Sequence, residues 1–113
     1  MKIIWEIMTF DELNKMAEER FGAMVKAVVD IEKEIMAVDA ELHADEEAGL
    51  LENGSKQENL WGINIYPEMP KSEWIEFDSM INLRPSQGNR TRGVDKPEIR
   101  QKIVEIVNKL VKK

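Results

Sequence analysis

The sequence predicts one α+β domain, in which helices pack on one face of a mainly antiparallel sheet with the element order β-α-β-β-α-β-β-α. Three observations support this prediction. Segments with the two-residue alternation of strands occur between residues 25 and 85, a capping box starts an early helix, and an apolar stripe of helical period closes the chain. The length of 113 residues fits a single domain, 1–113, with a modest core.

The first two elements are a strand and a helix. Residues 2–8, KIIWEIM, are apolar and rich in β-branched side chains, which favours a strand. The next letters, TFDE, have the form of a capping box, in which Thr9 and Glu12 satisfy each other's backbone amides. The helix then extends to about Arg20, and Gly22 suits its end.

Residues 25–31 and 35–42 are predicted to form a β-hairpin because β-branched residues crowd the first segment. Alternation then places Val25, Ala27, Val29 and Ile31 on one face, with Lys26, Val28 and Asp30 on the other. A helix stays open as the alternative, since the turn at residues 32–34 lacks the Gly or Asn that tight hairpins favour.

Residues 43–54 are predicted to form a short helix that His43 or Asp45 caps and Gly54 follows, with a polar connector at 55–60. The next two strands are expected at 61–67 and 73–85, joined by a loop with Pro67 and Pro70. In this interpretation the first strand turns Trp61, Ile63 and Ile65 to the core. The second turns Ile75, Phe77, Ile81 and Leu83 inward, and Trp74, Glu76, Asp78, Met80, Asn82 and Arg84 outward.

Residues 86–95 are rich in Gly and Asn and predict a loop. Asp95 is the expected cap of the last helix, with Pro97 in its first turn and Glu98 at the third helical position. The apolar stripe of this helix consists of Ile99, Ile103, Ile106, Val107, Leu110 and Val111.

Composition narrows the class of protein. Hydrophobic residues make up 42% and charged residues 34%, as in ordinary globular proteins. No apolar run approaches the roughly 18 residues that span a bilayer, and Glu6 and Asp11 come too early for a secretory signal. The chain has no cysteine, which excludes disulfides, thiolate zinc sites and cysteine nucleophiles. We therefore expect a cytoplasmic protein without membrane contact.

The charge is unevenly distributed along the chain. The net charge is −6, which argues against nucleic acid as a partner. Residues 1–58 hold 15 acidic and 6 basic side chains, whereas residues 59–113 hold 7 acidic and 10 basic ones. This asymmetry is compatible with an anion-binding patch on an acidic body, and also with ordinary solvated charges.

The segment ELHADEEAGLLENG, residues 41–54, contains the only histidine, His43, among five carboxylates. The histidine could serve as a general acid or base with Asp45 or Glu47 beside it, because its charge changes near neutral pH. It could also join Asp30, Asp45 or Glu47 in a metal site, although the spacing matches no metal motif and we assign no metal. A helix start with acids near its N-terminus explains the same residues.

The second candidate is the loop INLRPSQGNRTRG, whose arginines could bind a phosphate or carboxylate, or could pair with the acidic half of the chain. It is neither a Walker loop nor a dinucleotide motif. Third, Asn64 and Asn82 occupy strands against their propensity, either for function or for a bond between the strands. The tryptophans Trp5, Trp61 and Trp74 are expected in the core or an interface.

Three blocks of the sequence, VKAVVDIEKEIMAVDAELHADEE, LWGINIYP and SMINLRPSQGNRTR, resemble a family of small uncharacterised prokaryotic proteins, a domain of unknown function. The resemblance covers nearly the whole chain. In that family Gly often stands where this chain has Glu34 and Asp39, and such glycines would suit a tight hairpin there. The family supplies no activity, cofactor or catalytic residue, so the cofactor stays unknown.

These observations lead to two hypotheses and a weaker third. In the first, the protein binds an anionic small ligand or nucleotide, with His43 and Asp45 as acid–base residues and Asn64, Asn82, Arg84, Asn89 and Arg90 as ligand-binding residues. In the second, it is a non-catalytic homo-oligomeric module that uses an exposed sheet face or edge strand, with apolar contacts around Trp74, Met80 or Tyr66. The third is RNA or nucleotide binding through Arg84, Arg90, Arg92 and Arg100.

Overall fold

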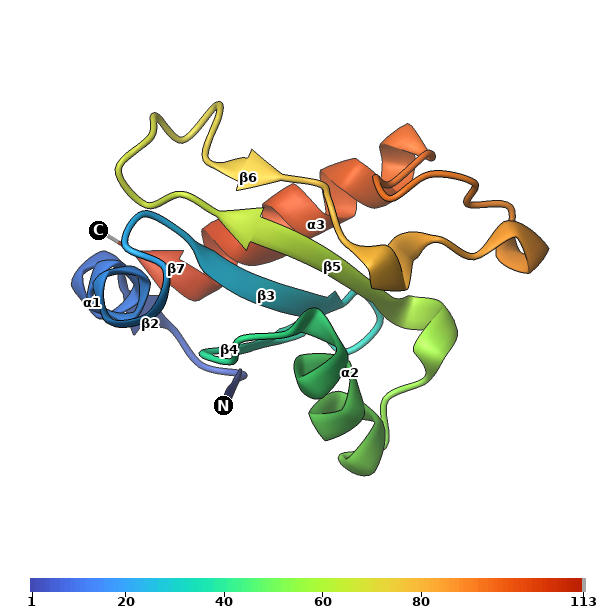
Figure 1. Cartoon of the computed structure of the whole chain (residues 1–113), viewed down its shortest axis with the longest axis horizontal. Coiled ribbons are helices and arrows are strands. Elements are labelled where there is room, and N and C mark those ends of the chain that lie inside the picture. Colours follow the sequence, from blue (N-terminus) through green and yellow to red (C-terminus); the bar gives the residue numbers. More distant parts are fainter. Residues whose placement is uncertain (113) are drawn as a thin grey trace.

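A computed structural model describes residues 1–112. Its principal sheet has five strands in the order β1-β4-β3-β5-β6, all paired antiparallel (Figure 1). Those strands are β1 (Lys2–Ile4), β3 (Val25–Asp30), β4 (Ile35–Val38), β5 (Leu60–Ile65) and β6 (Ile75–Glu76). The helices are α1 (Phe10–Arg20), α2 (His43–Glu52) and α3 (Pro97–Leu110). A separate parallel pair joins β2 (Met8–Thr9) to β7 (Val111–Lys112). The predicted α+β class with a mainly antiparallel sheet is confirmed.

The helices occupy both faces of the sheet. The larger apolar cluster joins α1 and α3 to one face through Leu13, Met16, Ile103 and Ile106, among others. The smaller cluster joins Leu50 of α2 to Val28, Ala37 and Leu60 on the opposite face (Figure 1). The prediction that all helices pack on one face therefore holds for α1 and α3 and is wrong for α2. Strands β3 and β4 carry apolar side chains on both faces, so helices must pack on both sides of the sheet to bury them.

Several local predictions are confirmed. Thr9 accepts a hydrogen bond from the Glu12 amide, as the capping box requires. The hairpin of β3 and β4 forms without Gly or Asn in its turn, because Asp30 supplies the turn chemistry. Its Oδ1 accepts from the amides of Glu32 and Lys33, and its Oδ2 accepts from the Ser55 hydroxyl. Among the described residues only Glu34 and Asp39 are non-glycine residues with positive φ, 57° and 65°, at the two positions where the resemblance implies Gly.

The segment predicted as a strand at 73–85 leaves the sheet early. Only Ile75 and Glu76 pair with β5, and two short helical turns follow, η2 (Met80–Asn82) and η3 (Pro85–Gln87). The expected alternation fails there as well, since Trp74 is buried in the larger cluster. The cause lies opposite Gly62 of β5, where the side chain of Asn82 bonds the backbone that a longer β6 would otherwise bond.

Other boundaries also differ from the prediction. The strand expected at 2–8 is divided into β1 and β2, and the strand expected at 35–42 ends at Val38, next to the positive φ of Asp39. The α2 helix follows Leu42, and the residue before α3 is Lys96, so the predicted caps His43, Asp45 and Asp95 are wrong. Asp95 instead accepts bonds from the Arg90 amide and the Thr91 hydroxyl. No helix in residues 1–112 has the length and apolarity needed to cross a membrane.

Candidate functional site

A hollow with a volume of about 420 Å³ lies beside the N-terminal end of α2. Three neighbouring strands supply its floor. Strand pairing places Lys26 of β3 opposite Asn64 of β5, and Asn64 opposite Glu76 of β6, which gives a row of polar side chains across the sheet. Two residues further along β3, Val28 is covered by α2, whereas the row itself is left open. The hollow is the place where α2 stops covering its face of the sheet.

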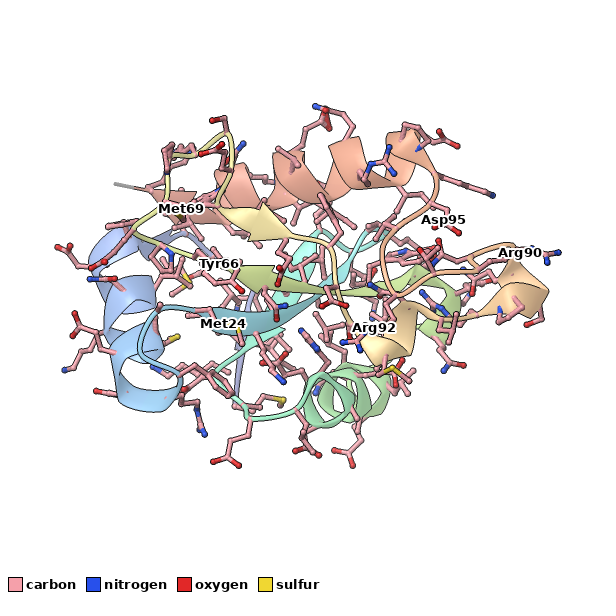
Figure 2. The ribbon with its side chains drawn as sticks, turned by 45° about the horizontal axis from the view of Figure 1, so that its top comes forward. Met24, Tyr66, Met69, Arg90, Arg92 and Asp95 are labelled. Carbon is pink, nitrogen blue, oxygen red and sulfur yellow. The ribbon has the colours of Figure 1, made fainter. Side chains whose placement is uncertain are left out.

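The remaining wall comes from the start of α2 and from two later segments. The polar residues that line the pocket are Lys26, His43, Asn64, Tyr66, Glu76, Asp78, Ser79 and Arg92; its apolar neighbours include Met24, Leu42 and Met80. Figure 2 shows Met24, Tyr66 and Arg92 around this part of the molecule. We refer to this hollow as the α2 pocket.

His43 is the first residue of α2 and is only 8% exposed. Its ring Nε2 lies 2.8 Å from the Ile63 carbonyl oxygen of β5. Burial lowers the pKa of the imidazole below its ordinary value, and the nearby cations Lys26 and Arg92 lower it further, while the Ile63 carbonyl and Asp78 oppose the shift. The ring is therefore neutral at pH 7, and one of its nitrogens is fixed by the sheet.

Asn64 and Tyr66 converge on one carboxylate. The Asn64 amide nitrogen donates to Glu76 Oε1 at 2.8 Å, and the Tyr66 hydroxyl donates to the same oxygen at 3.1 Å. The amide nitrogen of Asn64 also lies 3.3 Å from the Asp78 carbonyl oxygen. The Asn64 side-chain oxygen is buried and has no hydrogen-bond partner within residues 1–112. One acceptor in this wall is thus left unsatisfied by the protein, which is uncommon for a buried polar atom.

Two cationic side chains border the pocket. The Arg92 Nε forms an ion pair with Asp78 Oδ1 at 2.8 Å, so its two terminal nitrogens are not held by this contact. Lys26 forms no ion pair within the described part of the chain, and its Nζ lies 5.4 Å from the ring centroid of Phe21. The pocket therefore offers positively charged donors from Lys26 and Arg92.

Most of the loop residues predicted to bind a ligand are occupied within the protein. Asn82 is fully buried, and its side chain bonds the amide and carbonyl of Gly62 and the Arg92 carbonyl. Asn89 is also buried, and its Nδ2 donates to the carbonyls of Asn82, Thr91 and Gly93. These two amides hold the loop in place.

The arginines predicted to bind a ligand or RNA are also either bonded within the protein or placed away from the α2 pocket, apart from Arg92. Arg84 stacks 4.2 Å from the Trp61 ring centroid and donates to the carbonyls of Gln57 and Leu60. Arg90 is exposed at the outer tip of the loop, away from Arg92 and Tyr66 (Figure 2). Arg100 donates to the Val94 carbonyl. None of these three lines the α2 pocket.

Of the seven predicted site residues, the structure brings His43 and Asn64 into the α2 pocket. Asp45 is exposed on α2 and does not line it. His43 faces neither the segment 84–89 nor its own helix alone; it contacts β5 and the pocket. No group of three or more His, Asp and Glu side chains in residues 1–112 is placed to hold a metal ion.

The hypotheses drawn from the sequence name neither Lys26 nor Glu76 as a site residue. They name Arg92 only for RNA or nucleotide binding and Tyr66 only for an apolar interface. Lys26 and Glu76 were placed on outward strand faces, but a common outward face does not make two residues neighbours. Only the register Lys26–Asn64–Glu76 does so. One signal was present in the sequence: Lys26 is a charged residue inside the otherwise apolar segment VKAVV.

Comparison with protein families finds one match. Residues 2–110 match the family described as protein of unknown function (DUF5674). The chain belongs to this family. Because the match spans nearly all of the chain, the sheet, the three helices and the α2 pocket all lie within the shared region. Comparison with curated proteins and with solved structures finds no match. The family has no described function, so the α2 pocket is the feature of the chain that indicates one.

Proposed function

We propose that this protein binds a small anionic ligand in the α2 pocket. The observation that carries the proposal is the convergence of Lys26 and Arg92 with His43 and Asn64 around one open hollow. Its volume of about 420 Å³ falls in the range that accommodates metabolite-sized molecules. Lys26 and the terminal nitrogens of Arg92 supply charge-assisted donors for a carboxylate or phosphate. The anion site proposed here therefore lies on the sheet, and not in the loop at residues 84–90 where the sequence suggested it.

Acid–base chemistry at His43 would be the enzymatic form of this proposal, since His43 borders the space in which a ligand would lie. Asp45 has no part in it, because its side chain lies outside the pocket lining. An RNA ligand gains no support from the arginines, since Arg84 and Arg100 donate to backbone carbonyls within the chain.

Substitution of the two pocket cations tests the proposal. Lys26→Met and Arg92→Met each remove one charged donor but keep an unbranched side chain, so we expect each to weaken the binding of a carboxylate or phosphate about tenfold or more. Isothermal titration with inorganic phosphate, adenosine monophosphate and malate gives the Kd values. Arg90→Met is the matched control, because Arg90 lies two residues from Arg92 and outside the pocket. Equal losses in Arg90→Met and Arg92→Met would contradict the proposal.

A second candidate function, a homo-oligomeric module, is favoured by a separate observation at the N-terminus. Strand β1 is an edge of the sheet, and Trp5 and Ile7, which follow it, are 65% and 64% exposed. Extending β1 through Glu6 in an antiparallel pair of two copies would place Lys2 of each copy opposite Glu6 of the other. The expected surface at Trp74 gives no such support, because Trp74 is buried.

A charge exchange tests this candidate. If two copies pair through β1, Lys2→Glu should lower the average mass in solution at a given concentration, since it sets like charges opposite each other. The double variant Lys2→Glu/Glu6→Lys should restore the mass by exchanging the two partners. Light scattering after size-exclusion chromatography, over a hundredfold range of protein concentration, is the measurement. A monomeric wild type over the whole range would exclude the β1 dimer.

A further inference from the structure

The contact between His43 and β5 determines which ring nitrogen holds the proton. Nε2 lies 2.8 Å from the Ile63 carbonyl oxygen, and a carbonyl oxygen can only accept. Nε2 therefore donates. In the neutral ring the other nitrogen, Nδ1, then has a free lone pair.

The lone pair of Nδ1 is available to a ligand. Nδ1 makes no hydrogen bond within residues 1–112, and it is not sealed from solvent. The His43 side chain lines the α2 pocket. The unpaired side-chain oxygen of Asn64 is sealed from solvent, so it is not offered to a ligand. One free acceptor, His43 Nδ1, thus borders the pocket that Lys26 and Arg92 border with donors.

We propose that His43 Nδ1 accepts a hydrogen bond from the ligand, so that the ligand is a small carboxylate or phosphate with a hydroxyl or amino donor close to its anionic group. This inference rests on the proposed function and names the class of ligand. A simple anion would satisfy Lys26 and Arg92 but would leave His43 Nδ1 without a donor. A hydroxy acid or an amino acid satisfies both sides of the pocket, and an unpaired buried acceptor discriminates strongly against analogues that lack the donor.

The charged groups around His43 are compatible with this role. Lys26 of β3 and Arg92 of the later loop both disfavour a proton on the ring, and Asp78 is offset by its ion pair with Arg92. Glu46, one turn further along α2, is itself buried. His43 is therefore kept in the neutral state in which Nδ1 can accept.

The tautomer can be measured without a ligand. His43 is the only histidine, so its imidazole nitrogens give the only such signals in a long-range ¹H–¹⁵N spectrum of the whole chain. We expect the Nε2–H form at pH 7, with an unprotonated Nδ1 shift. A predominant Nδ1–H form, or a protonated ring, would overturn the inference whatever the protein binds.

Matched ligands then test the class. Malate and succinate differ by one hydroxyl group, and we expect malate to bind at least tenfold more tightly to the wild type. His43→Gln should reduce this ratio to near one, because the Gln amide can donate to Ile63 as Nε2–H does but has no acceptor at the Nδ1 position. Arg90→Met should keep the wild-type ratio. Equal binding of the two acids to the wild type, or an unchanged ratio in His43→Gln, would overturn the inference while leaving the anion site intact. Absence of any anion binding would overturn the proposed function, and the inference with it.

Discussion

Replacing Asn82 with alanine is expected to destabilise the protein by about 4 kcal/mol. The Asn82 side chain is fully buried, and it bonds the Gly62 amide at 2.8 Å, the Gly62 carbonyl at 2.9 Å and the Arg92 carbonyl at 2.9 Å. Alanine would leave these three backbone groups without partners and would open a cavity. Urea denaturation monitored by circular dichroism gives the change in the free energy of unfolding.

Asn14→Ala is the control for this prediction. Asn14 lies on α1, and within residues 1–112 its side chain makes one hydrogen bond, of 3.5 Å, to Glu18 at the surface. We expect a change within about 0.5 kcal/mol for this variant. If Asn82→Ala changed the free energy of unfolding as little as Asn14→Ala, the hydrogen bonds between Asn82 and Gly62 would not be the contacts that take the place of strand pairing at this edge.

Replacing Glu46 with glutamine is expected to stabilise the protein at neutral pH. Glu46 is fully buried in α2, and neither carboxyl oxygen has a partner of normal hydrogen-bond geometry within residues 1–112. Burial raises the pKa of this carboxyl from an ordinary 4.5 to about 9, although the Ala40 backbone and Lys26 favour the charged form. The folded protein therefore keeps a proton on Glu46 at pH 7 that the unfolded chain has lost.

The sign of the pH dependence follows from that difference. Between pH 4.5 and 9 the folded state binds more protons than the unfolded state, so this carboxyl lowers stability as pH rises through the interval. The accumulated cost at pH 7 is about 3 kcal/mol. Glutamine cannot ionise, so Glu46→Gln should match the wild type near pH 4.5 and exceed it increasingly toward pH 9.

Thermal and urea denaturation of both proteins at a series of pH values check this prediction. Glu52→Gln, at an exposed position of the same helix, is the control, and as a surface substitution it should change the free energy of unfolding at pH 7 by no more than about 0.5 kcal/mol. A gain from Glu46→Gln that is the same at every pH would show that Glu46 is not the group that titrates.

The parts of the fold that sequence predicts well depend on neighbours along the chain. The Thr9–Glu12 capping box, the apolar stripe of α3 and the alternation in β3 all arise from contacts a few residues apart or from one periodic face. The hairpin of β3 and β4 was predicted from its β-branched residues, but its turn chemistry was not, although Asp30 bonds amides only two and three residues further on.

The parts that sequence missed depend on distant partners. The early end of β6 results from Asn82 bonding Gly62, twenty residues away, where an added Cβ on Gly62 would lie 2.5 Å from the Ser79 Cβ. The alternation of apolar and polar residues in 73–85 does not indicate that contact. The pairing of Val111 with Met8 joins the two ends of the chain and is equally invisible to local patterns.

Only part of the candidate site could be predicted from the sequence, because the rest of it also depends on residues that are distant along the chain. His43 stands out in the sequence by its residue type, and Asn64 by its poor strand propensity. Lys26 and Glu76 join them only through the register of three strands. The arginines and asparagines of 84–90 drew attention as an anion site, yet Arg84 and Asn89 bond the chain itself, which holds the loop in place.

The measurement that tests the central claim most directly is a titration of the ¹⁵N-labelled protein with malate and with phosphate, followed by amide chemical shifts. Binding in the α2 pocket predicts saturable shifts at Lys26, His43, Asn64 and Arg92, all of which line it. The loop from Arg84 to Arg90 should change little by comparison. Saturable shifts confined to residues 84–90, with the pocket amides unmoved, would contradict the account and return the anion site to the loop.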